Sequence, residues 1–137
     1  MRTLVLDAWA VIAWLKRQEP AADQMRALLK AAERRECRLA INIVNLGEVF
    51  YLAVKARDLS YGRQVLDTLH PRVTTISAHD ELVMLAATLK AKHAISYADG
   101  FAAATALLQD APLVTGDPEM KAMAVMEKSL QLEWVGR

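Results

Sequence analysis

Short apolar segments typical of buried strands alternate with longer segments of helical period along the whole chain. Five segments have the strand pattern: 2–7, 38–43, 72–76, 112–115 and 130–135. The segments between them carry apolar residues at helical spacing, and no glycine- or serine-rich linker, repeat or low-complexity stretch interrupts the series. This alternation predicts one α/β domain over residues 1–137, a three-layer sandwich with a mostly parallel central sheet flanked by helices.

Several of the expected helices begin at recognisable start signals. Ser60 is expected to cap the helix that ends near residue 69, and Asp117 followed by Pro118 is expected to open another. The segments 77–80 and 96–99 have the serine-to-aspartate spacing of a capping box, in which two side chains satisfy free backbone N–H groups. Acidic residues at such positions therefore have a structural explanation before any functional one.

The composition excludes several classes of protein. The single cysteine, Cys37, excludes an internal disulfide and a zinc site built on cysteines, and the three histidines lack metal-ligand spacing. A net charge of +1 neither favours nor excludes a nucleic-acid partner, because local clustering decides that. The N-terminus has no long apolar signal region and no run of about 20 apolar residues occurs, so we expect a soluble cytoplasmic protein without membrane contact.

Hydrophobic residues are more frequent than one small core requires. They make up 54% of the chain. With glycine counted and tyrosine left out, the fraction is about 55%, against about 45–50% in typical soluble domains on that residue set. The excess predicts apolar surface that is covered by a second copy of the chain or by a protein partner.

Four acidic residues fall where ligands gather in parallel α/β folds, outside the carboxyl ends of the strands. Asp7 ends the first strand segment and Asp117 follows the segment 112–115, while Glu48 lies in the first turns of one helix and Asp99 at the start of another. The last three are individually explained as acids favoured near helix starts. Asp7 is not, because a carboxylate at the end of a buried strand needs a partner. The combination of the four, here called the acidic quartet, favours a functional site.

Four segments, taken in order, resemble the four motifs of PIN-domain nucleases. They are Leu4–Asp7, Asn45–Val49, Ile95–Asp99 and Leu113–Asp117. The resemblance covers essentially the whole chain at family-like spacing, and it is greatest to the VapC-type toxins of bacterial toxin–antitoxin pairs.

The resemblance implies a metal-dependent endoribonuclease in which the acidic quartet holds one or two Mg²⁺ or Mn²⁺ ions and directs water at an RNA phosphodiester bond. Hard divalent cations prefer such oxygen ligands, acidify bound water and neutralise charge on the phosphate. Asn45, Ser96 and Thr115 are expected to orient the acids through hydrogen bonds. The implied partners are an RNA substrate, a cognate antitoxin protein and a second copy of the chain in a homodimer.

The chain departs from the family pattern directly after its first acid. Many relatives have a hydroxyl residue one or two positions further on, whereas Ala8 and Trp9 stand here. We therefore expect one supporting hydrogen bond of the site to be missing. Glu119, two residues after Asp117, is expected to be solvated rather than a metal ligand.

Other interpretations start from the same first acid. Phosphoaspartate enzymes and receiver domains also place an acid after their first strand, but the phosphatase type needs Asp-x-Asp, and Trp9 occupies the second position. A dinucleotide-binding module needs a glycine-rich turn that 8–11 does not have.

Two further alternatives stay open, a housekeeping PIN-domain nuclease of RNA processing and a non-catalytic α/β interaction module. An antitoxin-like reading frame directly upstream would favour the toxin. Metal titration of the purified protein would separate a nuclease from an interaction module.

Overall fold

A five-stranded parallel sheet forms the centre of the protein. The computed structural model describes all 137 residues. The strands are β1 (Arg2–Leu6), β2 (Cys37–Asn42), β3 (Val73–Ile76), β4 (Leu113–Thr115) and β5 (Leu132–Trp134). Their order in the sheet is β3-β2-β1-β4-β5, and every neighbouring pair is parallel. The predicted parallel sheet is confirmed.

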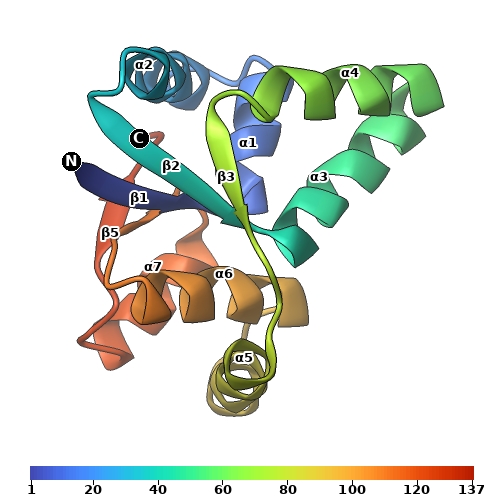
Figure 1. Cartoon of the computed structure of the whole chain (residues 1–137). Coiled ribbons are helices and arrows are strands. Elements are labelled where there is room, and N and C mark those ends of the chain that lie inside the picture. Colours follow the sequence, from blue (N-terminus) through green and yellow to red (C-terminus); the bar gives the residue numbers. More distant parts are fainter.

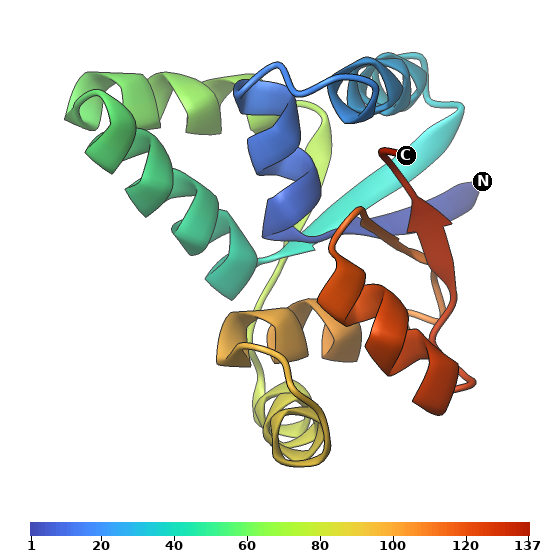
Figure 2. The same ribbon diagram turned by 180° about the vertical axis from the view of Figure 1, so that it is seen from behind.

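Seven helices cover the two faces of this sheet. They are α1 (Ala8–Leu15), α2 (Ala21–Glu33), α3 (Ile43–Ala56), α4 (Leu59–Leu69), α5 (Asp80–Lys92), α6 (Tyr97–Leu108) and α7 (Pro118–Met126). The first four lie in one layer and the last three in the other, as the two opposite views show (Figures 1 and 2). The expected three-layer α/β sandwich is therefore confirmed. None of the helices is both long and apolar enough to cross a membrane.

Alternating side chains of the central strands build two separate cores. Leu4 and Leu6 of β1 pack on one face with Ile41 of β2, in the core formed with α1 to α4. Val5 and Ala40 point to the other face and pack against α5, α6 and α7. Both faces are apolar because both are covered by helices, as is usual for parallel sheets.

Two helix caps and the place of Asp7 differ from the sequence prediction. Asp58, not Ser60, caps α4, because its carboxylate Oδ1 accepts from Tyr61 N at 2.8 Å. His79 caps α5 in place of Ser77, with Nδ1 accepting from Leu82 N at 3.3 Å. Asp7 lies just outside β1 and caps α1. Any side chain with a hydrogen-bond acceptor at the right offset can cap a helix, so a serine nearby does not fix the start.

The order of the strands reverses next to β1. From β1 the chain moves to β2 and then β3 on one side, and afterwards places β4 and β5 on the other side. In open parallel sheets, ligands bind outside the carboxyl ends of the strands at such a reversal. The residues directly after the two flanking strands are Asp7, after β1, and the turn Gly116–Asp117, after β4.

Candidate functional site

Asp7 is a buried carboxylate with one unsatisfied oxygen. Its side chain is 1% exposed. Oδ1 accepts from Ala10 N at 2.8 Å, whereas the buried Oδ2 has no hydrogen-bond partner in the chain. The pKa of Asp7 is raised from 3.8 to about 7, chiefly by burial and also by the charges of Asp99 and Asp117, while hydrogen bonds from the Thr115 side chain and the Ala10 N–H act to lower it. A buried oxygen of this kind is unfavourable unless a cation or a proton compensates it.

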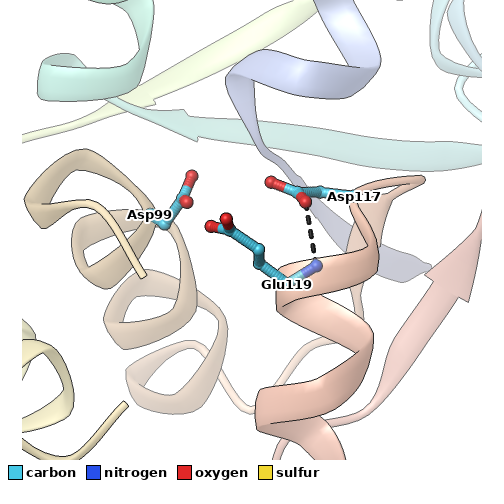
Figure 3. Close-up of side chains that lie close together, drawn as sticks. All are labelled: Asp99, Asp117 and Glu119. Carbon is cyan, nitrogen blue, oxygen red and sulfur yellow. Dashed lines mark hydrogen bonds between the residues drawn. The ribbon is translucent and has the colours of Figure 1, made fainter. Parts of the chain in front are cut away.

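Three further carboxylates form a tight cluster, of which Asp7 is not a member. Asp99 comes from the first turn of α6, Asp117 from the N-cap of α7 and Glu119 from the first turn of α7. One ligand oxygen of each lies within 4.8 Å of those of the others, and the side chains point toward one another (Figure 3). The two helix starts thus bring together acids that are about 20 residues apart in the sequence.

Helix capping fixes the positions of these acids. Ser96 Oγ accepts from Asp99 N at 3.1 Å, and Ser96 N donates to Asp99 Oδ2 at 3.4 Å, which completes the predicted capping box. Asp117 Oδ1 accepts from Glu119 N at 2.9 Å. Each carboxylate uses one oxygen for its cap, so its other oxygen stays available for a ligand.

Asn45 and Thr115 contact the backbone beside the acids. Asn45 Nδ2 donates to the carbonyl of Ala98 at 2.9 Å and so ties α3 to the first turn of α6. Thr115 Oγ1 accepts from Asp117 N at 3.1 Å. Both residues are fully buried, at 1% and 0% exposure. Asn45 thus holds the residue before Asp99, and Thr115 holds the backbone of Asp117 itself. The Thr115 side chain also lowers the pKa of Asp7.

Glu48 lines the same pocket as Asp99 and Asp117, although it is not part of the tight cluster. It lies on α3, and its pKa is raised by burial and by the charge of Asp99. The pocket has a volume of about 390 Å³. Its lining residues are Ala8, Trp9, Ile12, Lys16, Gln18, Glu48, Leu52, Ser96, Asp99 and Asp117. Three of the acidic quartet therefore border one pocket, and the charges of two of them, Asp99 and Asp117, raise the pKa of the buried Asp7.

The acids destabilise one another in their charged forms. Burial raises the pKa of Asp99, the Ser96 hydrogen bonds lower it, and the charges of Asp117 and Glu119 raise it further. Every ligand atom offered is a carboxylate oxygen, and neither cysteine nor histidine belongs to the cluster. Together with the unsatisfied Asp7 Oδ2, this donor set fits a hard divalent cation of the Mg²⁺ or Mn²⁺ type.

A larger cavity, of about 590 Å³, lies at the opposite edge of the sheet. Arg35, Arg38, His70 and Arg72 line it, and no carboxylate side chain does. A cation held by oxygen ligands does not fit there. The smaller acidic pocket is the one whose lining can hold such a cation.

Glu119 is the residue whose position differs most from expectation. It is exposed, as the sequence suggests, but its carboxylate joins Asp99 and Asp117. The signal in the sequence is the spacing Asp117-Pro118-Glu119 at a helix start, which puts two acids in one turn. Their approach to Asp99 depends on how α6 and α7 pack, which no local pattern gives.

Solved structures with the same fold include chains of toxin–antitoxin complexes and a toxin. A chain of the VapBC2 complex of Rickettsia felis, bound to a promoter DNA fragment, has a TM-score of 0.73 at 21% identity, covering 98% of this chain and 99% of that chain. DNA-bound VapBC of Salmonella typhimurium gives 0.72 at 16% identity, with 98% of each chain covered. VapC20 of Mycobacterium tuberculosis, a toxin that cleaves the sarcin–ricin loop, gives 0.71 at 12% identity, covering 87% of this chain and 93% of that chain.

The sequence itself matches one protein family. A search of curated proteins gives no match. The PIN domain family, in contrast, matches residues 4–126, a range that includes the whole acidic quartet and Glu119. With a match over most of its length and the same fold as the solved VapC-containing complexes, this chain belongs to the PIN domain family.

Proposed function

We propose that this protein is a metal-dependent endoribonuclease and the toxin of a toxin–antitoxin pair. The observation that carries the proposal is the convergence of Asp99, Asp117 and Glu119 at the reversal point of the sheet. The charges of Asp99 and Asp117 also act on the buried Asp7, whose Oδ2 is unsatisfied. Membership of the PIN domain family and the shared fold with VapC toxins support it. Carboxylates that repel one another lower stability, so a cluster of them indicates a function that requires it.

Asp99, Asp117 and Glu119 would hold a divalent cation, with Asp7 and Glu48 contributing charge or further oxygens. When bound, Mg²⁺ or Mn²⁺ would neutralise charge that develops on the phosphate and make a water acidic enough to attack it. The protein supplies a rigid arrangement of oxygens. The capping bonds of Ser96, Thr115 and the α7 start keep the carboxylates in place before the substrate arrives.

The first test measures cleavage of RNA by the purified protein with Mg²⁺ or Mn²⁺. We expect a short RNA to be cut, EDTA to abolish cutting, and Asp99→Asn to reduce the rate by more than about a hundredfold, because loss of a charged ligand exceeds the effect of a supporting residue. Asp67→Asn, an exposed acid on α4, is the matched control and should leave the rate unchanged.

Two results would reject the assignment. One is unchanged activity of Asp99→Asn after contaminating nucleases have been excluded. The other is a wild-type protein that neither cleaves RNA nor binds a divalent cation, which would favour the non-catalytic interaction module.

An apolar pocket beside the acids supports an antitoxin partner. It has a volume of about 350 Å³ between α1, α3 and the start of α4, and shares Ile12, Lys16 and Leu52 with the acidic pocket. The rest of its lining is mainly apolar, with Leu15, Ala53 and Tyr61. The two pockets form a continuous path on which a partner segment with an apolar side and a cationic end would cover both. The solved relatives are toxin–antitoxin complexes.

Co-expression tests this partner. If a short frame lies directly upstream, its product should restore growth of cells that express the toxin and should co-purify with it. Leu15→Arg, in the part of the apolar pocket that lies away from the acids, should weaken co-purification without reducing RNA cleavage. Failure of the upstream product both to rescue and to co-purify would favour a housekeeping nuclease.

Exposed apolar side chains support a homodimer. Met84, Val125 and Met126 are 67% to 72% exposed, and Tyr51 is 51% exposed. Such side chains are more favourable in an interface than in water. Light scattering should show a dimer at micromolar concentration, and a monomer at high micromolar concentration would contradict it.

A further inference from the structure

The acidic pocket continues along one side of α1. Trp9, Ile12 and Lys16 follow at intervals of three and four residues, so they share one face of this segment, and all three line the pocket. Gln18 lines it as well. The pocket that holds the acids therefore also contains an aromatic ring, a cation and a free amide.

The six-membered ring of the Trp9 indole packs against Gly116. A Cβ atom at position 116 would overlap both this ring and the Val135 carbonyl, so Trp9 packs directly against the turn between β4 and Asp117 in a way that only glycine permits. The side chain nevertheless remains partly exposed. An aromatic ring fixed before binding loses little conformational entropy when a ligand stacks on it.

The polar side-chain groups around the ring form no salt bridge or hydrogen bond within the protein. Lys16 takes part in none of the five salt bridges, although it borders the same pocket as three carboxylates. Neither the Trp9 indole N–H nor the Gln18 side-chain amide takes part in a hydrogen bond within the chain, whereas the Trp134 indole donates to Arg137 O at 3.0 Å. Arg17 has a left-handed backbone, with φ of 55°, at the turn between Lys16 and Gln18.

We propose that Trp9, Lys16 and Gln18 form a nucleotide subsite that takes one unpaired base of the RNA substrate and an adjacent phosphate. The base stacks on the Trp9 indole, the Lys16 ammonium contacts the phosphate, and the Gln18 amide meets the edge of the base. An aromatic platform beside a cation is how proteins bind single-stranded nucleic acid. The pocket volume of about 390 Å³ lies in the range of about 300–1,000 Å³ typical of small-ligand sites.

The subsite rests on the proposed RNA-cleaving function and adds a substrate preference to it. It uses the position at which the chain departs from the family pattern, since Trp9 stands where many relatives have a hydroxyl residue close to the first acid. A double-stranded RNA keeps its bases stacked, so the subsite favours an unpaired nucleotide next to the cleaved bond.

The stacking contact is tested by combining Trp9→Leu in the protein with an abasic residue in the RNA and comparing the single and double changes. The substrate is a short unstructured RNA that the wild type cuts at one position, with an abasic residue placed in turn on either side of that bond. At one position the abasic residue should lower kcat/KM of the wild type about ten- to hundredfold, mainly through KM. With Trp9→Leu the same abasic residue should have little further effect.

The outcomes separate this subsite from the proposed function. If the abasic RNA and Trp9→Leu reduce kcat/KM independently, so that their effects multiply, Trp9 only supports the Asp117 turn and the subsite is wrong. If the wild type cuts no RNA at all, the proposed function fails and the subsite with it. Trp9→Phe keeps an aromatic ring and should retain the sensitivity to the abasic residue; if Trp9→Leu does not fold, loss of this sensitivity in Trp9→Phe overturns the stacking contact.

Lys16 gives a second test that does not depend on packing, because its side chain is exposed. Lys16→Gln should weaken RNA binding and reduce the slope of log Kd against log salt concentration by about 0.7 to 1, as expected for one lost phosphate contact. The control is Arg17→Gln, an adjacent cation that does not line the pocket. Equal slopes for wild type and Lys16→Gln would overturn the phosphate contact.

Discussion

Aspartates cap helices in two regions of this molecule, with similar hydrogen bonds and different surroundings. At the start of α4, Asp58 Oδ1 accepts from Tyr61 N at 2.8 Å, and the side chain is exposed. At the carboxyl edge of the sheet, Asp7 Oδ1 accepts from Ala10 N at the same distance, and Asp117 Oδ1 accepts from Glu119 N at 2.9 Å. The capping bond itself therefore does not distinguish a structural acid from a functional one.

The difference lies in what surrounds each cap. At the sheet edge, burial and neighbouring negative charge raise the pKa values of Asp7, Glu48 and Asp99. No cation within the protein pairs with any of them. Caps can be recognised one at a time, whereas a metal site requires several unsatisfied oxygens at one place.

The largest expected difference between the two regions is in activity. Asp117→Asn and Asp58→Asn are matched changes, because both remove a charge from an N-cap and asparagine caps nearly as well as aspartate. Asp117→Asn should lower the rate of RNA cleavage more than about a hundredfold, since it removes a charged oxygen ligand. Asp58→Asn should leave the rate unchanged. Similar rates for the two variants would show that the edge acids are only caps.

The pH dependence of stability should also differ between the regions. The pKa of Asp7 is about 7 in the folded protein against an ordinary value of 3.8, so folding takes up a proton between these values. Stability in EDTA should therefore fall as the pH rises from about 4 to about 7, by roughly 3 to 4 kcal/mol from this group, and then level off.

Urea unfolding at pH 5 and pH 8 measures this slope. Asp7→Asn stays neutral and should lose most of the decrease, while Asp58→Asn should unfold with the wild-type slope. An Asp7→Asn variant with the full wild-type pH dependence would contradict the raised pKa.

A smaller effect is expected from relief of repulsion at Asp99. In EDTA, Asp99→Asn should raise the free energy of unfolding by about 1 kcal/mol, because it removes one of several mutually repelling charges. Asp58→Ala should lower it by about 1 kcal/mol through loss of the cap. Thermal unfolding without metal measures both, and destabilisation by Asp99→Asn would mean that the acids do not form a cluster.

The sheet could be predicted from the sequence because its signals are local. Apolar runs such as Leu4–Leu6 and Leu113–Thr115 form the strands at the predicted places. The acidic quartet could be proposed from the sequence because each member ends a strand or lies in the first turns of a helix. Helix starts were less predictable, because Asp58 and His79 compete with nearby serines as caps.

Two features of the site could not be predicted from local pattern. The approach of Glu119 to Asp99 depends on the packing of α7 beside α6. The lack of a partner for the buried Oδ2 of Asp7 depends on which side chains the fold brings to it. Both follow from tertiary contacts between segments far apart in the sequence.

The central claim is that the acids at the sheet edge form one cation site. Calorimetric titration of the metal-free protein with Mn²⁺ tests it most directly, with wild type, Asp99→Asn and Asp58→Asn compared under the same conditions. We predict saturable binding to wild type and to Asp58→Asn, and binding to Asp99→Asn that is at least about tenfold weaker. Absence of binding to the wild type, or equal affinity of all three proteins, would contradict the claim.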